Sequence, residues 1–353
     1  MAVPPLAGYS KPASMKSGRK KIVRYRVIPG TELNAAVICM GTAGFGGHMS
    51  REEAYRLLDL YVEQGGNFID TALVYDDWVG QGRSLTEIRL GEWLKERGHR
   101  EKLILATKGG HPELATMHIP RLRRQDLKDD IARSLRQLQT EYIDLYWLHR
   151  DDASVPVDEI METLHEELKA GRIRSIGCSN WTVERIKQAQ SYAAARGLTP
   201  FAASQPLWNL AVITPGAIGD PTLVAMSDAD RGYFAETGMT VIPYSSQANG
   251  FFSGRYARGT DPGGEGSASA VRRMYFNDAS FDRLERVQRL AEELGSSGTA
   301  VALAYLTSQP FPVYPIIGTT KPAHVPECCS ASELTLTPEQ LLYLETGSYV
   351  SAV

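Results

Sequence analysis

From residue 37 onward, short apolar runs rich in β-branched residues alternate with longer segments in which apolar residues recur every three or four positions. Several short runs are apolar on consecutive residues, as expected of strands that are covered on both faces. This alternation predicts βαβ units and a parallel sheet. The eight segments with strand character are 37–41, 67–72, 103–108, 143–149, 173–180, 201–206, 239–246 and 313–319.

The longer segments contain recognisable helix signals. Ser50 followed by Glu53 forms a capping-box pattern that begins one helix, and Gly65 and Gly66 end it. Apolar residues at three- and four-residue steps predict further amphipathic helices over 127–138 and 157–168. Before the first of the eight strand-like segments, residues 22–27 and the turn at 28–31 predict a β-hairpin. If the eight strands close into a barrel, this hairpin would cover its bottom.

Eight strand–helix alternations favour a closed (β/α)8 TIM barrel. An open doubly wound sheet is the alternative on pattern alone, but no GxGxxG turn follows the first strand. Residues 257–270 contain four glycines and a proline, which predicts a long flexible loop after the seventh strand. No other composition break separates two domains. We therefore expect one barrel domain over residues 1–353, in which residues 1–20 form a loose N-terminal arm.

The composition fits an enzyme of small molecules. A chain of 353 residues suits one α/β barrel with added loops, and 38 Lys and Arg nearly balance 41 Asp and Glu. No long-range field therefore favours nucleic acid or an anionic membrane. Residues 1–22 lack the apolar stretch of a signal peptide, and no later run approaches the roughly 20 residues that span a bilayer. We expect a cytoplasmic protein.

The four cysteines are Cys39, Cys178, Cys328 and Cys329, with neither CxxC nor His-rich spacing. A disulfide scaffold is not expected, and the sequence predicts no metal site. No neighbouring feature lowers the thiol pKa of the adjacent pair Cys328 and Cys329. We therefore interpret this pair as structural.

Titratable residues gather at the ends of three successive strands. Asp70 lies near the end of the second strand, with Tyr75 five residues beyond, whereas Lys108 and His149 end the third and fourth strands. Taken singly, each has a structural explanation, such as an aspartate that caps a helix or a solvated lysine. Active sites of such barrels lie at the C-terminal ends of the strands. Together these residues form a candidate proton-transfer site.

Proton donation by Tyr75 requires help from its neighbours. An ordinary tyrosine has a pKa of about 10, so donation near neutral pH needs roughly 4 kcal/mol of differential stabilisation. The ammonium of Lys108 favours tyrosinate, and Asp70 keeps Lys108 protonated in a partly desolvated pocket. His149 would orient the substrate oxygen.

The same residues lie within longer motifs: GNFIDTALVY at 66–75, ATK at 106–108, DLYWLHR at 144–150, GCSN at 177–180 and PIIGTTK at 315–321. With these motifs the sequence resembles the aldo-keto reductase superfamily over nearly its whole length. The resemblance implies that Tyr75 is the general acid, that Lys108 and Asp70 tune it, and that His149 orients the carbonyl group.

The resemblance also implies NADPH as cofactor. Ser179, Asn180 and Gln205 would hydrogen-bond the nicotinamide carboxamide, and Tyr244 would stack on the ring. The glycine-rich stretch after strand seven could close over the dinucleotide. The other expected cofactor contacts are Gly41, Thr42, Asp70, Ser245, Gly250, Ser253, Gly254, Arg255, Gly318, Thr319, Thr320, Lys321 and His324.

Several positions depart from the family pattern. Asp76 stands where glycine is common, which predicts an acidic group at the substrate entrance and substrates with hydroxyl groups or a positive charge. His324 stands where arginine is usual, Cys328 where asparagine is common, and Pro326 interrupts the short helix between them. An imidazole does not offer the permanent bidentate fork of arginine. We therefore expect a narrower preference for NADPH, with NADH usable.

The sequence thus predicts an NAD(P)H-dependent oxidoreductase that reduces aldehydes, ketones or open-chain sugars to alcohols. Two alternatives stay open: a sugar or polyol dehydrogenase that runs in the oxidative direction, and a cofactor-sensing regulatory subunit that resembles the potassium-channel β subunits. The four intact site residues favour the enzyme. Four tryptophans lie on or just beyond strand ends and either line the substrate pocket or pack under loops; they are Trp78, Trp147, Trp181 and Trp208.

Overall fold

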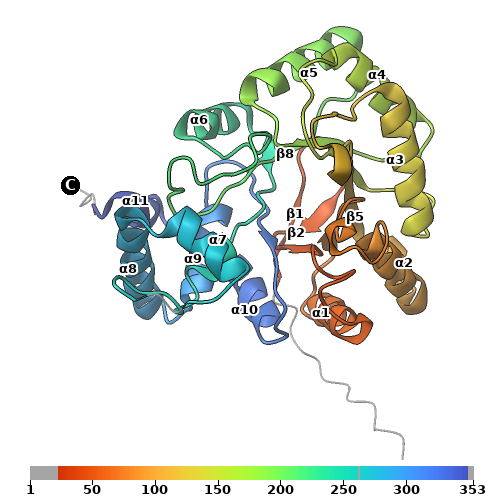
Figure 1. The fold of residues 1–353 in the computed structure, drawn as a ribbon. Coiled ribbons are helices and arrows are strands. Elements are labelled where there is room, and N and C mark those ends of the chain that lie inside the picture. The colour runs from red at the N-terminus through yellow and green to blue at the C-terminus, as the bar shows by residue number, and fades with distance from the viewer. Residues whose placement is uncertain (1–22, 261–262, 349–353) are drawn as a thin grey trace, which may run out of the picture.

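Parallel strands form the centre of the molecule, and the helices surround them (Figure 1). The structure, a computed structural model, describes residues 23–260 and 263–348. The strands of the main sheet follow the order β10-β3-β4-β5-β6-β7-β8-β9. Their bounds are β3 Cys39–Gly41, β4 Phe68–Asp70, β5 Ile104–Gly109, β6 Leu145–Leu148, β7 Ile176–Ser179, β8 Ala203–Gln205, β9 Thr240–Val241 and β10 Ile316–Ile317.

The sheet closes on itself. At one side β10 pairs with β3, where Ile316 lies opposite Cys39. At the other side a parallel bridge joins Val241 to Val313, and the Tyr314 amide donates to the Val241 carbonyl at 3.0 Å. The predicted (β/α)8 barrel is therefore confirmed, and the open sheet is excluded.

The predicted strands are confirmed, although most are shorter than their apolar runs. All but β5 lie inside the predicted ranges, and β5 extends one residue further, to Gly109. In the seven strands β4 to β10, every strand residue is buried. The consecutive apolar runs thus reflect strands covered inside the barrel and by the outer helices.

A hairpin covers the N-terminal ends of the barrel strands. Its strands, β1 Tyr25–Val27 and β2 Asn34–Ala36, pair antiparallel. The Ala36 amide donates to Asn67 Oδ1 at 2.7 Å, just before β4, and Tyr314 Oη donates to the Arg26 carbonyl at 3.2 Å, just before β10. The predicted hairpin and its position are confirmed, whereas the predicted arm at 1–20 lies outside the described residues.

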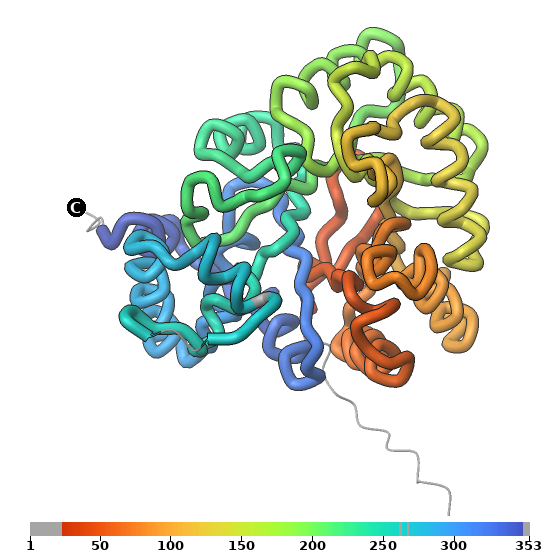
Figure 2. The backbone as a smooth tube through the Cα atoms, viewed as in Figure 1, coloured from red at the N-terminus to blue at the C-terminus, as the bar shows by residue number. Residues whose placement is uncertain are grey.

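The helices follow the predicted pattern, and the capping box of Ser50 with Glu53 is present at the start of α1. Figure 2 shows how the chain passes around the barrel. The helix bounds are α1 Arg51–Glu63, α2 Leu85–Arg97, α3 Arg124–Gln137, α4 Val157–Lys169, α5 Val183–Arg196, α6 Asp228–Thr237, α7 Ser267–Tyr275, α8 Asp278–Glu293, α9 Gly298–Thr307, α10 His324–Ser330 and α11 Pro338–Thr346.

The predicted end of the loop at residue 270 is wrong, because α7 begins at Ser267. Ala268, Val271 and Tyr275 are buried at three- and four-residue steps, so an apolar face that continues past residue 270 holds this helix. Earlier in the segment, Arg258 forms ion pairs with α8. The part of the loop that contains Arg258 is thus attached to α8.

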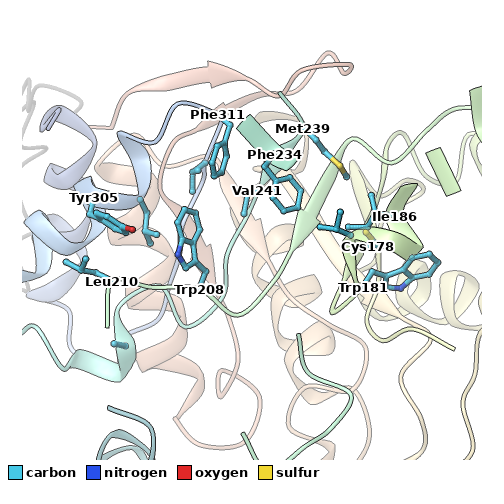
Figure 3. Close-up of a cluster of buried hydrophobic side chains, with 14 of the residues drawn as sticks. Cys178, Trp181, Ile186, Trp208, Leu210, Phe234, Met239, Val241, Tyr305 and Phe311 are labelled. Carbon is cyan, nitrogen blue, oxygen red and sulfur yellow. The ribbon is translucent and has the colours of Figure 1, made fainter. Parts of the chain in front are cut away.

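Large aromatic side chains fill the space between the β7–β9 side of the barrel and the outer helices (Figure 3). Trp208 stacks on Phe311 with ring centroids 5.9 Å apart, and Phe311 in turn contacts Phe234 on α6. Trp181 meets Phe201 edge to face at 5.3 Å. Within the described residues, no helix has both the length and the apolar character required to cross a bilayer.

Candidate active site

The structure brings the four predicted catalytic residues together at the C-terminal ends of the strands. Asp70 ends β4, Lys108 lies in β5, His149 follows β6, and Tyr75 lies in the loop after β4. The Lys108 ammonium donates to Asp70 Oδ2 at 2.5 Å, to the Thr71 carbonyl at 2.8 Å and to Tyr75 Oη at 3.0 Å. These three contacts use all three N–H donors of the ammonium.

The electrostatics of this group set its protonation states. Burial alone would lower the pKa of Lys108, but Asp70 and Tyr75 outweigh burial, and the net pKa is raised. Burial raises the pKa of Tyr75, while Lys108 opposes this effect. Burial and the cations Arg150 and Lys108 hold the pKa of His149 well below its usual value. At neutral pH the site thus contains an ammonium, a protonated phenol and a neutral imidazole.

Two rings contact the His149 imidazole. The Tyr75 ring meets it edge to face with centroids 5.9 Å apart, and the His111 ring lies at 4.9 Å. The His111 Nδ1 atom lies 2.6 Å from the Pro112 carbonyl oxygen. The sequence analysis missed His111, although its position three residues after Lys108 already placed it at the same strand end.

Buried amide and hydroxyl groups from β7, β8 and β9 lie next to this cluster. Gln205 Nε2 donates to Asp70 Oδ1 at 3.1 Å, and Ser179 Oγ donates to the Gln205 carbonyl at 2.8 Å. Asn180 Nδ2 donates to the His149 carbonyl at 3.2 Å. Tyr244 Oη donates to Asn180 Oδ1 at 2.8 Å. The donors and acceptors of this set match those of a carboxamide, so it fits the nicotinamide end of the implied cofactor.

Gly41 and Thr42 have clear packing functions in the structure. A Cβ atom at Gly41 would lie 2.7 Å from Ile316 Cγ2, so the close approach of β10 requires glycine there. Thr42 is fully buried, and its hydroxyl donates to the Asp70 carbonyl at 3.0 Å. Both residues thereby fix the end of β4 that carries Asp70.

Two further segments, the loop after β9 and the segment after β10, carry most of the remaining predicted cofactor contacts. In the first, Ser245 and several following residues have positive φ, and Ser253 Oγ donates to the Gly250 carbonyl at 2.7 Å. Gln247, which the sequence analysis missed, accepts the Gly318 amide at 2.8 Å and links this loop to the segment after β10. The exposed predicted contacts here are Ser253, Gly254, Arg255, Gly318, Thr320 and Lys321.

The segment after β10 is ordered by local hydrogen bonds. The Lys321 amide donates to Thr319 Oγ1 at 3.0 Å, and the same hydroxyl lies 3.2 Å from His324 Nδ1. The cationic side chains of Arg255 and Lys321 are exposed. Exposed cations and a hydroxyl-rich turn fit the phosphates of a dinucleotide.

The adjacent cysteines are buried behind this segment. Cys328 Sγ lies 3.2 Å from Gln247 Nε2, which donates to it. Burial raises the pKa of Cys328 and raises that of Cys329 to about 12. Both thiols therefore stay protonated, as the structural interpretation of this pair requires. Among the described residues, no group of three or more His, Cys, Asp and Glu is arranged to bind a metal ion.

The prediction that Asp76 places a free acidic group at the entrance is wrong. Its side chain is fully buried and accepts from the Gly46 amide at 2.6 Å, the Gly47 amide at 3.0 Å and Thr86 Oγ1 at 2.7 Å. The carboxylate thus holds the loop after β3 against the loop after β4. Its φ of 67° is left-handed, which explains why glycine also suits this position.

Of the four predicted pocket tryptophans, Trp78 alone is exposed, by 49%, and its ring lies edge-on at 6.2 Å from Tyr75. Trp147 is fully buried inside the barrel, where a Cβ atom on Gly177 would come within 2.4 Å of its ring. Trp181 and Trp208 belong to the core of Figure 3. For these three residues the structure favours the packing alternative, because their side chains are buried in the core. Strand-end position alone does not give the direction of a side chain.

Comparisons with known proteins agree with this geometry. A sequence profile described as "Aldo/keto reductase family" matches residues 37–346. A putative aryl-alcohol dehydrogenase of Saccharomyces cerevisiae is 31% identical over 326 residues, which cover 89% of this chain and 81% of the relative. An NADP(+) aryl-alcohol dehydrogenase of Phanerodontia chrysosporium is 29% identical over 92% of this chain and 86% of its own.

More distant similarity extends the comparison. Norsolorinic acid reductase B of Dothistroma septosporum is 28% identical over 92% of this chain and 81% of its own. A crystal structure of a thermostable aldo-keto reductase with the inhibitor epalrestat superimposes with a TM-score of 0.69 at 22% identity. The match covers 92% of this chain and 99% of that structure, which shows the same fold.

Proposed function

The chain belongs to the aldo/keto reductase family, whose members are oxidoreductases of small carbonyl compounds, and from this premise we propose its specific reaction. The protein reduces an aldehyde or ketone to an alcohol, with Tyr75 as the proton donor. The observation that carries the proposal is the Lys108 ammonium, which bonds Asp70 Oδ2 at 2.5 Å and Tyr75 Oη at 3.0 Å.

The proton moves from Tyr75 Oη to the carbonyl oxygen. The tyrosinate that remains is stabilised by the N–H of Lys108, and Asp70 keeps that ammonium charged. His149, whose pKa is low, stays neutral and can orient the substrate oxygen without competing as an acid. A bound nicotinamide supplies the hydride, and the protein supplies orientation and exclusion of water.

NADPH is the proposed cofactor. Ser179, Asn180 and Gln205 present the buried amides and hydroxyl that suit the carboxamide, with Tyr244 beside them. Exposed Arg255 and Lys321 suit the phosphates. The printed name of the Phanerodontia chrysosporium relative, which specifies NADP(+), supports the same choice.

An aromatic carbonyl compound is the proposed substrate class. The names of the relatives refer to aryl alcohols and norsolorinic acid, and Trp78 offers an exposed apolar ring beside Tyr75. Sugars or polyols in the oxidative direction, and a cofactor-sensing subunit, are the competing functions. A panel of aromatic aldehydes, sugars and polyols, assayed by NADPH absorbance, separates them, because the sensor would turn over none of these compounds.

Replacing Tyr75 by Phe tests the proton donor. The change removes the hydroxyl and keeps the ring against His149 and Trp78, so NADPH affinity should persist while turnover falls by roughly 100-fold or more. Steady-state rates and fluorescence titration of NADPH measure the two effects. Turnover within a few-fold of the parent would overturn the assignment.

Replacing His324 by Arg tests cofactor choice. An imidazole does not offer the planar bidentate fork with which a permanently charged arginine binds a ribose phosphate. The variant should widen the preference for NADPH over NADH by about one decade, the lower value for one charge-assisted hydrogen bond. Dissociation constants of both cofactors measure the ratio. An unchanged ratio would show that His324 does not face the phosphate.

A further inference from the structure

Arg150 follows His149 directly at the mouth of the barrel, and its guanidinium is poorly satisfied. Nη1 donates to the His149 carbonyl at 3.0 Å, and Nη2 reaches Asp220 Oδ2 only at 3.4 Å. Nε is buried and has no hydrogen-bond partner among the described residues. The side chain as a whole keeps 12% of its surface exposed, so a ligand can still reach it.

Other half-buried arginines of this protein are better satisfied. Arg185 uses Nε on Asp151 at 3.2 Å and Nη2 on the Asp152 carbonyl at 3.1 Å. Arg121 donates to both carboxylate oxygens of Asp130, at 2.9 and 3.3 Å. An arginine has five N–H donors, and leaving a buried one without a partner costs about 1 to 3 kcal/mol. The unused donor of Arg150 therefore calls for a ligand that the protein itself does not provide.

Asp220, the carboxylate partner of Arg150, is held mainly by other hydrogen bonds. Asp220 lies in the segment between β8 and α6, where its Oδ1 atom accepts the Thr222 amide at 2.9 Å and the Thr222 hydroxyl at 2.6 Å. These local bonds hold Asp220 without the arginine. A ligand anion can thus replace the 3.4 Å contact while Asp220 keeps its own hydrogen bonds.

The position of Arg150 is that of a substrate contact. Its Nη1 atom donates to the His149 carbonyl, which also accepts from Asn180 Nδ2. The guanidinium thus lies beside His149, where burial and this charge both contribute to the lowered pKa of the imidazole. Lys108, the other nearby cation, is already paired with Asp70. Burial lowers the pKa of His111, so its ring is neutral. Arg150 is therefore the cation next to the reacting groups that has capacity for an anion.

We propose that Arg150 binds an anionic oxygen group, a carboxylate or a phosphate, on the carbonyl substrate of this enzyme. This inference rests on the proposed reductase function. The planar guanidinium can donate two parallel N–H bonds to such a group, with Asp220 displaced from it. Trp78 is exposed and its ring lies edge-on to Tyr75, so it would contact the apolar ring of the same substrate.

The test compares matched substrates that differ in charge. 4-Formylbenzoate is paired with its neutral methyl ester, and 4-formylphenyl phosphate is paired with 4-methoxybenzaldehyde, so that the two arms distinguish carboxylate from phosphate. The wild-type enzyme should favour the anion of at least one pair in kcat/KM. Arg150→Met should lower that anion-to-neutral ratio by about 10-fold or more, equivalent to about 1.4 kcal/mol.

Two further variants sharpen the test. Asp220→Asn should raise the same ratio several-fold, because the competing carboxylate is gone. Arg174→Met removes an arginine at the opposite end of the barrel, where it pairs with Asp144, and should leave the ratio unchanged. If both members of each pair are reduced and Arg150→Met leaves both ratios unchanged, the proposal is overturned.

A binding measurement separates failure of this inference from failure of the reductase function. Calorimetry with benzoate and with benzamide reports anion recognition without turnover. Benzoate affinity should fall about 10-fold or more in Arg150→Met while benzamide affinity stays the same. Equal benzoate binding in both proteins would overturn the anion site. Weaker NADPH binding in Arg150→Met with unchanged substrate ratios would assign the arginine to the cofactor and overturn the proposal as well.

Discussion

At the scale of single residues, Asp76 shows how a charged side chain can be structural beside a reactive one. Its carboxylate receives three hydrogen bonds from Gly46, Gly47 and Thr86, and it directly follows Tyr75. The loop that carries the proposed proton donor is thereby fixed to the loop after β3. Asp76 thus helps to fix the position of its neighbour Tyr75.

Asp76→Asn should destabilise the fold, because a neutral amide oxygen in place of Oδ2 accepts weaker hydrogen bonds from the Gly46 amide, the Gly47 amide and Thr86 Oγ1. Hydrogen bonds to a charged group contribute about 1.5 to 3 kcal/mol, so the free energy of unfolding should fall by about 2 kcal/mol or more. Urea denaturation measures the change. The control Asp129→Asn alters an exposed aspartate on α3 and should change stability by less than about 0.5 kcal/mol. Equal stability of the two variants would contradict this account of Asp76.

Sequence position revealed some residues of the site and hid others. Asp70, Lys108 and His149 could be found because barrel strands place their terminal residues at one mouth. The environment of Asp76 could not be found, since its partner Gly46 lies in the loop after β3 and its partner Thr86 lies at the start of α2. Loop packing brings such groups together, and no periodicity in the sequence records it.

At the scale of elements, Glu87 joins α2 to β5. It is fully buried and accepts from Thr107 Oγ1 at 2.6 Å. Burial raises its pKa to about 7, against the opposing effect of Thr107. The folded protein therefore keeps a proton on Glu87 at pH values where the unfolded chain has lost it.

This proton predicts a pH dependence with a definite sign. The stability that Glu87 contributes is full below about pH 4.5, where both states are protonated, and is lost as pH rises to about 7. Glu87→Gln removes the titration. Between about pH 5 and about pH 8 the stability of the wild type relative to this variant should fall by about 2 to 3 kcal/mol.

Chemical denaturation at the two pH values measures the difference. Glu92→Gln is the matched control, because Glu92 lies on the same helix with a side chain 45% exposed. A constant difference between wild type and Glu87→Gln across this pH range would show that Glu87 is ionised throughout.

Elements differ in how much of their structure is local. The capping box at Ser50 and the apolar stripes of α3 and α4 are local, and they were predictable. The start of α7 was not, because glycines precede it and its buried face, with Val271 and Tyr275, becomes visible only past the loop. The composition of residues 257–270 reports only the average character of that segment. The start of α7 depends instead on the apolar residues that follow the segment.

At the scale of the whole molecule, the barrel has one weakly paired side. Strands β5 and β6 share four residue pairs in register, whereas β9 and the chain before β10 share the single bridge of Val241 with Val313. Eight strand-like segments allowed closure to be predicted. The number of residue pairs between neighbouring strands depends on where each strand leaves the sheet. The pattern of apolar residues in the sequence does not give these positions.

Hydrogen exchange should reveal this difference. Local opening requires less free energy where fewer ladder bonds must break together. The amides of Val241, Tyr314 and Ile316 should therefore exchange roughly 10-fold or more faster than those of 104–109 under native conditions. Mass spectrometry of exchanged peptides measures both regions. Equal protection at the two places would mean that the barrel opens only as one unit.

The pairing of β3 with β10 also has a consequence for protein synthesis. Met40 lies opposite Ile317, and roughly 280 residues separate them. At about 5 to 20 residues per second, the ribosome needs about 14 to 56 seconds to produce that stretch. Throughout this time the nascent sheet has an unpaired edge at β3, whose N–H and C=O groups can bind another chain. A chaperone that covers strand edges therefore has about 14 to 56 seconds to act before the last strand arrives.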